Sequence, residues 1–310
     1  MDSAETVFIV NPKAGNGSTG SNWPVIKSMA EKRLDDFKSF LTDGPGDARK
    51  LTKTAIAEGA CLVVCVGGDG TLNEVVNGFM ESDESMRADV RLGFIPNGTG
   101  CDIVRTISIP ANIEQAIEVI VAGNVRPIDV GRLFFKDHEG GNAYRYFHNV
   151  ASFGLGGEVA QRVNRTSKAW GPFISFIRAT LLSLFLDGKK KVSLKIDDQP
   201  EEGYRIWNVA VANGQYHGGG MWIAPDAAID DALFNVTIIG DLSLLQVFFN
   251  LPKLYSGRIA EISKVRMLTA RKIEAVSEQN VLLDIDGEQP GVLPAVFEIL
   301  PGALRMITAV

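Results

Sequence analysis

A glycine-rich loop with one aspartate follows a buried-strand pattern in the first quarter of the chain. Residues 61–66 read CLVVCV and residues 67–78 read GGDGTLNEVVNG, which predicts a strand that ends in a tight turn before a helix. The N-terminus of a helix presents unpaired backbone N–H groups and the positive end of the helix dipole, and both attract an anion. Gly67, Gly68 and Gly70 allow the turn and the close approach of a phosphate. The segment therefore predicts a phosphate-binding loop.

Asp69 stands inside this loop and indicates a metal ion. A carboxylate repels a phosphate unless a cation or a sugar hydroxyl lies between them, so we expect a nucleotide with Mg²⁺. The two common nucleotide motifs do not explain the loop. The chain has no GxxxxGK[ST] string, and Asn73 stands where GxGxxG requires its last glycine. The alternative interpretation is that the segment only connects a strand to a helix and binds no ligand.

Two other segments repeat the arrangement of strand, polar glycine loop and helix. Residues 11–17 (NPKAGNG) follow the apolar residues 7–10, and residues 96–105 (PNGTGCDIVR) follow the apolar residues 92–95. The carboxyl ends of parallel strands meet at one edge of an open α/β sheet, which is the usual position of a ligand. We therefore expect the three loops to line one nucleotide site, where the hydroxyl of Thr71 donates to phosphate oxygens.

The pattern of apolar residues changes near residue 128. Up to that point, short apolar strands alternate with helical patterns, which predicts a mainly parallel sheet. Beyond it, strands are separated by polar and glycine-rich turns, which predicts an antiparallel β-sandwich with two helical insertions. We therefore expect a nucleotide-binding α/β domain over residues 1–128 and a β-sandwich domain for the acceptor substrate over residues 129–294. Residues 295–310 hold short apolar strands that are able to complete the first domain.

Composition and charge limit the class of protein. The chain has 310 residues, of which 45% are hydrophobic and 22% charged, as in a globular protein of two domains. Its net charge of −6 argues against nucleic acid as the main partner. Cys61, Cys65 and Cys101 form no disulfide framework, and the first residues lack the basic and apolar stretches of a secretory signal. We therefore expect a cytoplasmic protein.

The most apolar stretch, residues 169–186, is too short to span a membrane. Gly171, Pro172 and Arg178 interrupt it, and the uninterrupted part is below the ~20 residues that a spanning helix requires. A helix that faces the core is one interpretation. A wall through which a lipid reaches the site, or a helix at a membrane interface, is the other, because Trp170 belongs to a group of aromatic residues there. We expect no transmembrane segment.

Two acidic segments in the second half of the chain offer further chemistry. Asp286 and Glu288 flank Gly287 near the end of a strand pattern, and a carboxylate is able to take a proton from an attacking hydroxyl. A hairpin turn is the alternative, because Asp-Gly is a strong turn signal. Residues 226–231 form the second acidic segment, and oxygen ligands of this kind suit a hard cation.

These motifs together resemble the diacylglycerol kinase catalytic-domain family. GGDGT is shared by NAD kinases and by this family, whereas LNEVVNG, NPKAGNG and PNGTGCD look like its lipid-kinase branch. The resemblance continues through residues 152–159, 211–234 and 284–288, so it covers nearly the whole chain. Bacterial soluble diacylglycerol kinases, sphingosine kinases and ceramide kinases belong to this group. In the family, the last strands return to the first domain.

The resemblance and the loops together imply the nucleotide and catalytic residues. By resemblance, Glu288 is the proton acceptor, and Asp286 beside it is an orienting residue or a member of the cation network, with Asp69 as the third catalytic residue. Residue types alone leave the roles of Asp286 and Glu288 open. The predicted nucleotide-binding residues are Asn11, Pro12, Lys13, Ala14, Gly15, Thr42, Gly67, Gly68, Asp69, Gly70, Thr71, Leu72, Asn73 and Thr99.

The resemblance also implies a structural Mg²⁺ site. Its ligands are the Asp231 carboxylate and the backbone carbonyls of Ala228 and Leu233. Ala232 stands where the family usually has glycine and Asn235 where it often has an acidic residue, and a substituted glycine alters the loop if the position needs a positive φ. Cys101 is a third departure, at a position where the family commonly has asparagine.

The sequence therefore predicts an ATP- and Mg²⁺-dependent lipid kinase that phosphorylates the hydroxyl of a diacylglycerol-like or sphingoid acceptor at a membrane surface. The alternatives are a NAD kinase-like or other small-molecule kinase, and an inactive nucleotide-sensing module. A NAD kinase should carry a second, NE-type motif past the first domain, and the sequence shows none. The three histidines lack the spacing of metal ligands. We expect a cytoplasmic protein that binds membranes peripherally, with a homodimer as an open alternative to a monomer.

Overall fold

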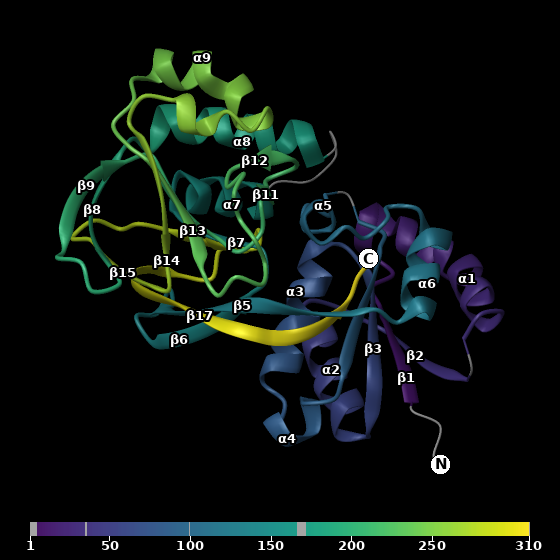
Figure 1. The fold of residues 1–310 in the computed structure, drawn as a ribbon. Helices are drawn as coiled ribbons and strands as arrows, with labels where there is room; N and C mark the ends of the chain where they lie inside the picture. Colours follow the sequence, from purple (N-terminus) through teal and green to yellow (C-terminus); the bar gives the residue numbers. More distant parts are fainter. Residues whose placement is uncertain (1–4, 35, 99, 166–171, 310) are drawn as a thin grey trace. The chain divides into compact units, whose positions relative to one another are not determined.

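The computed structural model describes residues 5–34, 36–98, 100–165 and 172–309. Contacts along the chain divide it into two units (Figure 1). The first comprises Met1–Asp129 and Pro301–Val310, and the second comprises Val130–Leu300.

The first unit is built on a mainly parallel sheet. Its strand order is β2-β1-β3-β4-β17, and β1, β2, β3 and β4 pair in parallel. The central strand β3 is almost entirely buried, because both of its faces are covered by helices. In Figure 1, α2 and α3 lie on one face of the sheet, and α1 and α6 lie on the other. The elements are β1 (Glu5–Val10), η1 (Ala14–Gly17), α1 (Ser18–Glu31), β2 (Phe37–Leu41), α2 (Asp47–Ala57), β3 (Ala60–Gly67), α3 (Asp69–Met80), α4 (Glu84–Arg87), β4 (Arg91–Pro96), α5 (Val104–Ile107) and α6 (Ile113–Ala122).

Strand β17 (Val292–Ile307) contributes to both units. Near its end, Met306 pairs with Leu92 of β4 in parallel, so the chain returns to the first sheet as predicted. Its first part pairs with β15 of the second unit instead. The sequence pattern predicts two short strands here, and the structure has one. Gly302 adopts φ 57° inside the strand, and its N–H donates to Asp129 Oδ1 at 2.7 Å, so the backbone is held at the irregular position.

The second unit consists of antiparallel sheets, as the turn-rich sequence predicts. One sheet has five strands in the order β14-β13-β10-β7-β16, and a second layer contains β17, β15, β8 and β9, with β5 and β6 beside β17. The strands are β5 (Val125–Lys136), β6 (Asn142–Phe147), β7 (Val150–Gly154), β8 (Lys190–Ile196), β9 (Glu202–Ile206), β10 (Asn208–Ala212), β11 (Tyr216–His217), β12 (Met221–Trp222), β13 (Phe234–Ile239), β14 (Val265–Ala270), β15 (Lys272–Val276) and β16 (Leu283–Ile285).

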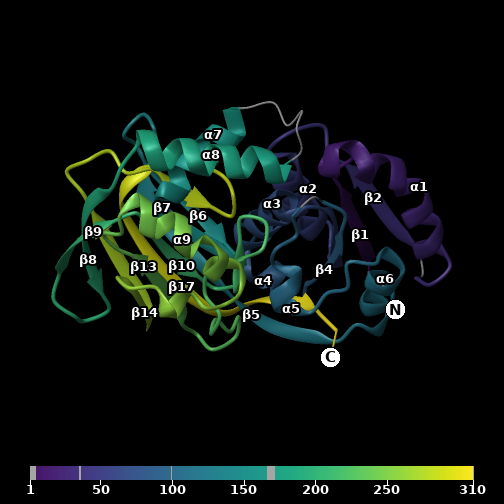
Figure 2. The same ribbon diagram turned by 90° about the horizontal axis from the view of Figure 1, so that it is seen from above.

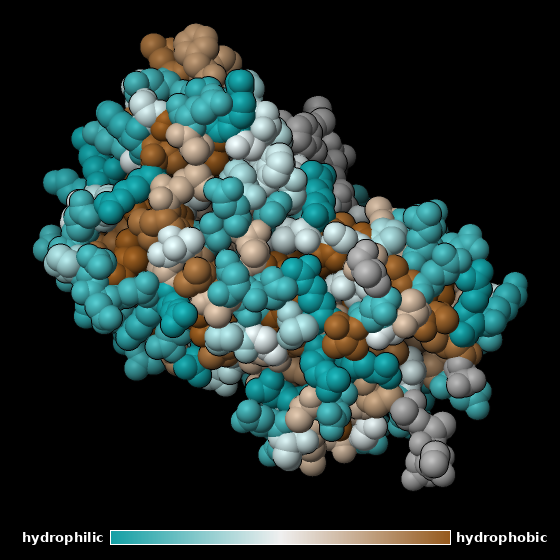
Figure 3. All heavy atoms as spheres, viewed as in Figure 1, coloured by the Kyte–Doolittle hydropathy of each residue, from teal (hydrophilic) through white to brown (hydrophobic). Residues whose placement is uncertain are grey.

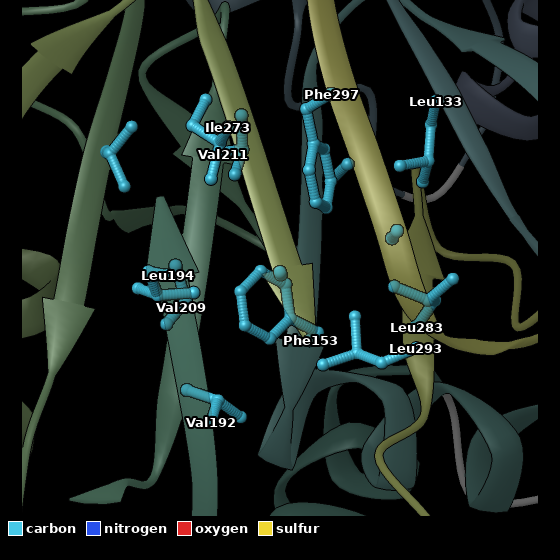
Figure 4. Close-up of a cluster of buried hydrophobic side chains, with 14 of the residues drawn as sticks. Leu133, Phe153, Val192, Leu194, Val209, Val211, Ile273, Leu283, Leu293 and Phe297 are labelled. Carbon is cyan, nitrogen blue, oxygen red and sulfur yellow. The ribbon is translucent and has the colours of Figure 1, made fainter. Parts of the chain in front are cut away.

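The main core of this unit lies between the two layers. Figure 4 shows Phe153 from β7 and Phe297 from β17 among the side chains that fill it. Their ring centroids are 5.8 Å apart, within the range for favourable aromatic pairs. Residues that alternate along each strand point into this core, which is the packing expected of a β-sandwich.

Helices cover a second, smaller core on the five-stranded sheet. They are α7 (Leu155–Arg165), α8 (Pro172–Leu186), α9 (Leu244–Tyr255) and the short η2 (Ile259–Glu261). Leu184 of α8 and Ile259 of η2 are buried in this cluster, and Val247 of α9 packs against it. Figure 2 shows α7 and α8 side by side. Among the described residues, no helix is long and apolar enough to cross a membrane. Trp170 of the predicted apolar stretch lies outside the described residues.

Candidate active site

The three predicted phosphate loops lie together in the first unit. Asn11, directly after β1, donates from its backbone N–H to Val66 O of β3 at 3.0 Å. Its side-chain Nδ2 donates to Thr71 Oγ1 at 2.9 Å. Asn97, after β4, donates from its backbone N–H to Gly67 O at 2.7 Å. Hydrogen bonds thus connect the ends of β1, β3 and β4, where the sequence predicts one site.

Glycines are required where these loops touch. A Cβ on Gly98 would lie 2.4 Å from Gly68 Cα, so the two backbones approach more closely than any other residue type permits. Gly15 has φ +58°, and a Cβ there would meet Asn97 O at 3.2 Å. These positions leave backbone groups, not side chains, at the surface formed by the loops.

Asp69 is the first residue of α3, and its Oδ2 accepts a hydrogen bond from the backbone N–H of Asp102 at 3.1 Å. Cys101, beside it, is buried and has φ 47°. Burial, with a smaller effect of the Asp69 charge, raises the pKa of the Cys101 thiol to about 12. Asparagine adopts a positive φ more readily than most residues, which accounts for the asparagine that we expect in relatives at this position.

The other described residues of the predicted nucleotide site lie on these loops, except Thr42, which follows β2. Lys13 Nζ donates to Asp43 O at 2.7 Å, and Thr42 is buried with its N–H bonded to Val10 O at 2.9 Å. Pro12, Ala14, Gly70, Leu72 and Asn73 belong to the segments after β1 and β3. Thr99 lies outside the described residues.

Glu74 supports these loops and was missed by the sequence analysis. Its carboxylate accepts from the backbone N–H groups of Gly46 and Ala48, at 2.7 and 3.1 Å. These donors lie at the start of α2, where a carboxylate is favoured by the helix dipole. The sequence distance hides this contact, because a cap supplied by another helix leaves no local pattern.

Asp286 is buried in the second unit and saturated with hydrogen bonds. It accepts from the backbone N–H groups of His148, Asn149 and Val150 at 3.1, 3.2 and 2.9 Å. His148 Nδ1 lies 2.9 Å from Asp286 Oδ2. The side chain of Asp286 is only 1% exposed. This carboxylate therefore holds the chain between β6 and β7 in place.

Glu288 has different surroundings, although it lies only two residues away. Its side chain is 39% exposed, and its Oε2 accepts from a guanidinium nitrogen of Arg145 on β6. The backbone between them is a hairpin turn: Ile285 and Glu288 exchange both N–H···O bonds, and Asp286 and Gly287 have φ 48° and 91°. The backbone here is therefore the hairpin turn that the Asp-Gly sequence predicts, and the side chains of Asp286 and Glu288 lie in different environments on either side of it.

A second carboxylate and histidine contact lies on β16. Asp284 is buried, its Oδ2 lies 2.9 Å from His217 Nε2, and its Oδ1 accepts from Gly287 N at 2.9 Å. The Ser152 hydroxyl lies 3.4 Å from the same Oδ2. His217, one of the three histidines without metal-ligand spacing, thus contacts the strand that precedes the acidic turn.

The predicted metal loop has the donor atoms that Mg²⁺ prefers. Asp231 is exposed, and its Oδ1 accepts from the Leu233 N–H at 3.0 Å, which bends the loop around the carboxylate. Ala232 adopts φ 61°, so this position does need a positive φ. In the part of the chain that the structure describes, no three His, Cys, Asp or Glu side chains gather to hold a metal ion. The predicted ligands are one carboxylate and two carbonyls, so this site stays a prediction.

Comparison with known proteins agrees with the geometry. Residues 5–133 match the diacylglycerol kinase catalytic domain, and residues 149–308 match the YegS C-terminal NAD kinase beta sandwich-like domain. A diacylglycerol kinase of Staphylococcus saprophyticus is 28% identical over 305 residues, which cover 97% of this chain and 94% of the relative. A diacylglycerol kinase of Staphylococcus aureus (strain MRSA252) is 29% identical over 294 residues, covering 94% and 88%.

Solved structures show the same fold. A putative diacylglycerol kinase from Bacillus anthracis superposes with a TM-score of 0.79 at 26% identity, covering 99% of this chain and 95% of that one. Yeast NADH kinase complexed with NADH has a TM-score of 0.54 at 13% identity, covering 100% and 85%, which shows a common fold alone.

The chain belongs to the diacylglycerol kinase catalytic-domain family. It is a kinase that transfers phosphate to an alcohol group of its acceptor.

Proposed function

We propose that this protein is an ATP- and Mg²⁺-dependent lipid kinase that transfers the γ-phosphate to the hydroxyl of a diacylglycerol-like or sphingoid acceptor. The observation that carries the proposal is the contact among three glycine-bearing loops at the ends of β1, β3 and β4. We assign the nucleotide to residues 1–128, completed by residues 295–310, and the acceptor to residues 129–294.

Backbone groups and small side chains bind the polyphosphate in this proposal. The first turn of α3 presents N–H groups and the positive end of its dipole, and Thr71 lies in that turn. Asp69, also in that turn, faces the cation that accompanies ATP. Mg²⁺ would supply positive charge to offset the charge that develops on the transferred phosphoryl group. The hydrogen bond from the Asp102 N–H, which is partly buried, fixes the carboxylate of Asp69 before the nucleotide arrives.

Glu288 is the proton acceptor in this proposal, and Asp286 is a structural residue. Three backbone N–H groups donate to the carboxylate of Asp286, so both of its oxygens are engaged in holding the backbone. Glu288 is partly exposed at a turn, where an acceptor hydroxyl has access. Arg145 orients the Glu288 carboxylate through one oxygen. Positioning an acceptor hydroxyl against such a group supplies the remaining requirement for transfer.

Two features of the second unit support a lipid acceptor and a structural cation. Phe185 on α8 is 72% exposed, and its neighbours Leu181, Leu182 and Leu186 are exposed as well, as for a helix that meets acyl chains. The loop of Asp231, with the carbonyls of Ala228 and Leu233, is assigned to structural Mg²⁺. We propose a cytoplasmic protein that acts peripherally at the membrane.

The test is an incubation of the pure protein with ATP, Mg²⁺ and a panel of lipids in mixed micelles, with NAD in parallel. We expect phosphate to appear on a diacylglycerol or a sphingoid base. Phosphorylation of NAD without any lipid product would refute the lipid assignment. Hydrolysis or binding of ATP with no acceptor in the panel would favour another small-molecule kinase or a sensing module.

A further inference from the structure

Helix α9 turns an apolar side away from the protein. Val247 and Leu254 pack against the smaller core of the second unit. Leu245 and Phe249 are two residues before and two residues after Val247, so each points about 160° away from it on a helix of 3.6 residues per turn. Leu245 is 71% exposed and Phe249 is 75% exposed. The helix is therefore held by one side and presents hydrophobic side chains on the other.

The exposed side continues through neighbouring positions. Leu244 and Phe248 are exposed, and the rings of Phe248 and Phe249 meet edge to face with centroids 5.9 Å apart. Within α9, which the structure describes completely, no side chain is acidic. Figure 3 shows brown, hydrophobic atoms at the top of the view, where Figure 1 places α9. A contiguous apolar surface of this kind marks a site of association with another surface.

Three basic side chains surround Asp241, the residue that lies shortly before the start of α9. Lys189 forms an ion pair with Asp241, three residues before the helix begins. Arg205 approaches the same carboxylate at 3.7 Å, and Lys264 Nζ donates to the Asp241 backbone oxygen at 2.6 Å. Three positive groups thus meet one negative group. The hydrogen bond from Lys189 lowers the pKa of Asp241, as do the nearby positive charges.

The other end of the helix repeats this imbalance. Lys253 and Arg258 both approach Glu261, at 3.7 and 3.8 Å. Both ends of α9 therefore carry more positive than negative groups, although the whole chain has a net charge of −6. A local positive rim around an apolar helix face complements an anionic lipid surface.

We propose that the exposed side of α9, with the basic groups at its two ends, docks on the surface of a bilayer that contains anionic lipids. Leu245, Phe248 and Phe249 enter the boundary between headgroups and acyl chains, and the basic groups contact lipid phosphates. The inference deepens the proposed function, because it rests on an acceptor that resides in a bilayer. A twofold contact between two copies would bring the same positive groups together, so the charge distribution favours the membrane over self-association.

Vesicle binding tests this proposal. We would sediment the protein with vesicles of equal parts phosphatidylcholine and phosphatidylglycerol, and with vesicles of phosphatidylcholine alone. We expect stronger binding to the anionic vesicles and a loss of binding as salt increases. The double variant Leu245→Ser with Phe249→Ser should weaken binding by about tenfold or more, because each side chain loses the free energy of apolar burial. The double variant Arg205→Glu with Lys264→Glu should weaken binding to anionic vesicles and reduce its dependence on salt.

Control variants and a second assay separate the outcomes. Val25→Ser removes an exposed apolar side chain from the first unit, so vesicle binding should not change. Phosphorylation of dioctanoylglycerol in detergent micelles should be the same in all variants, since α9 contains no residue of the proposed site. If the variant Leu245→Ser with Phe249→Ser binds vesicles as strongly as the wild type, the docking proposal is overturned. If that variant still phosphorylates the lipid in micelles, the proposed function stands. Vesicle binding without any lipid phosphorylation overturns the proposed function alone. A dimer in solution that dissociates on Leu245→Ser assigns the face to a second copy and overturns the proposal.

Discussion

Replacement of Asp286 by asparagine should destabilise the protein. Asparagine accepts a positive φ as readily as aspartate, so the backbone at φ 48° tolerates the change and the effect comes from the side chain. The carboxylate of Asp286 accepts from three backbone N–H groups, two of them between β6 and β7 and the third on the first residue of β7. An amide offers one acceptor oxygen, and its NH₂ group then points at an N–H that it cannot accept from.

The magnitude follows from those contacts. A hydrogen bond to a charged group contributes about 1.5–3 kcal/mol, and a buried donor without a partner costs about 1–3 kcal/mol. Loss of one such bond with one orphaned donor lowers the free energy of unfolding by about 3 kcal/mol or more. For a unit of the size of Val130–Leu300, this corresponds to a fall in Tm of about 10 °C.

Glu288→Gln is the matched control for this experiment. Its side chain is partly exposed, and an exposed ion pair such as that with Arg145 contributes about 1 kcal/mol or less, so Tm should change by about 3 °C or less. The turnover number should fall by on the order of 10² to 10⁴ while the affinity for ATP changes little. Calorimetry and lipid phosphorylation on both variants give the four measurements. An Asp286→Asn protein that melts like the wild type but is inactive, beside an active Glu288→Gln protein, would refute the structural role of Asp286 and transfer the base to it.

Three further outcomes are expected. Asp69→Asn keeps an oxygen that accepts from the Asp102 N–H, so Tm should stay nearly unchanged. The KM for ATP with Mg²⁺ should rise by on the order of tenfold or more. Unchanged activity at limiting ATP and Mg²⁺ would contradict the assignment of Asp69 to the nucleotide loop. Ala232→Gly should raise Tm by about 2 °C, because relief of left-handed strain of about 1–2 kcal/mol exceeds the glycine entropy cost of about 0.5–1 kcal/mol; a lower Tm would contradict the strain. Cys101, with its pKa raised to about 12, has a thiolate fraction on the order of 10⁻⁴ at pH 8, so a disulfide reagent should modify the half-buried Cys61 first and reach Cys101 only after unfolding.

Local sequence patterns were sufficient for the first unit. Each predicted phosphate loop there follows a short apolar strand and precedes a helix, as at β3 and α3, and the sheet is mainly parallel as predicted. The information is local, because glycines, apolar runs and helix starts act within a few residues of each other. The helical pattern of residues 23–33 favours a start near Trp23, whereas helix α1 begins at Ser18, because the left-handed Gly17 ends the preceding turn.

Long-range contacts decided the strand breaks in the second unit. The apolar and β-branched residues of 144–153 (YRYFHNVASF) favour one continuous strand, whereas the structure ends β6 at Phe147 and begins β7 at Val150. The interruption occurs where Asp286 accepts the backbone N–H groups, and a carboxylate more than a hundred residues away leaves no sign in the local pattern. In the opposite sense, β17 continues through Pro301 and Gly302, because neighbours in both units pair with it.

The sequence by itself determined the class of protein, the parallel and antiparallel organisation, and the segments that carry glycines and carboxylates. Residue type and spacing are enough to predict these features, because the residues of a glycine-rich loop or an acidic turn are close together in the sequence. Only the tertiary structure decided that Asp286 is buried and fully hydrogen-bonded whereas Glu288 is partly exposed beside Arg145. The reason is that the availability of a carboxylate for chemistry depends on which donors surround it. Those donors come from β6, from the two residues after it and from the first residue of β7, which are far away in the sequence and are brought to the turn by the fold.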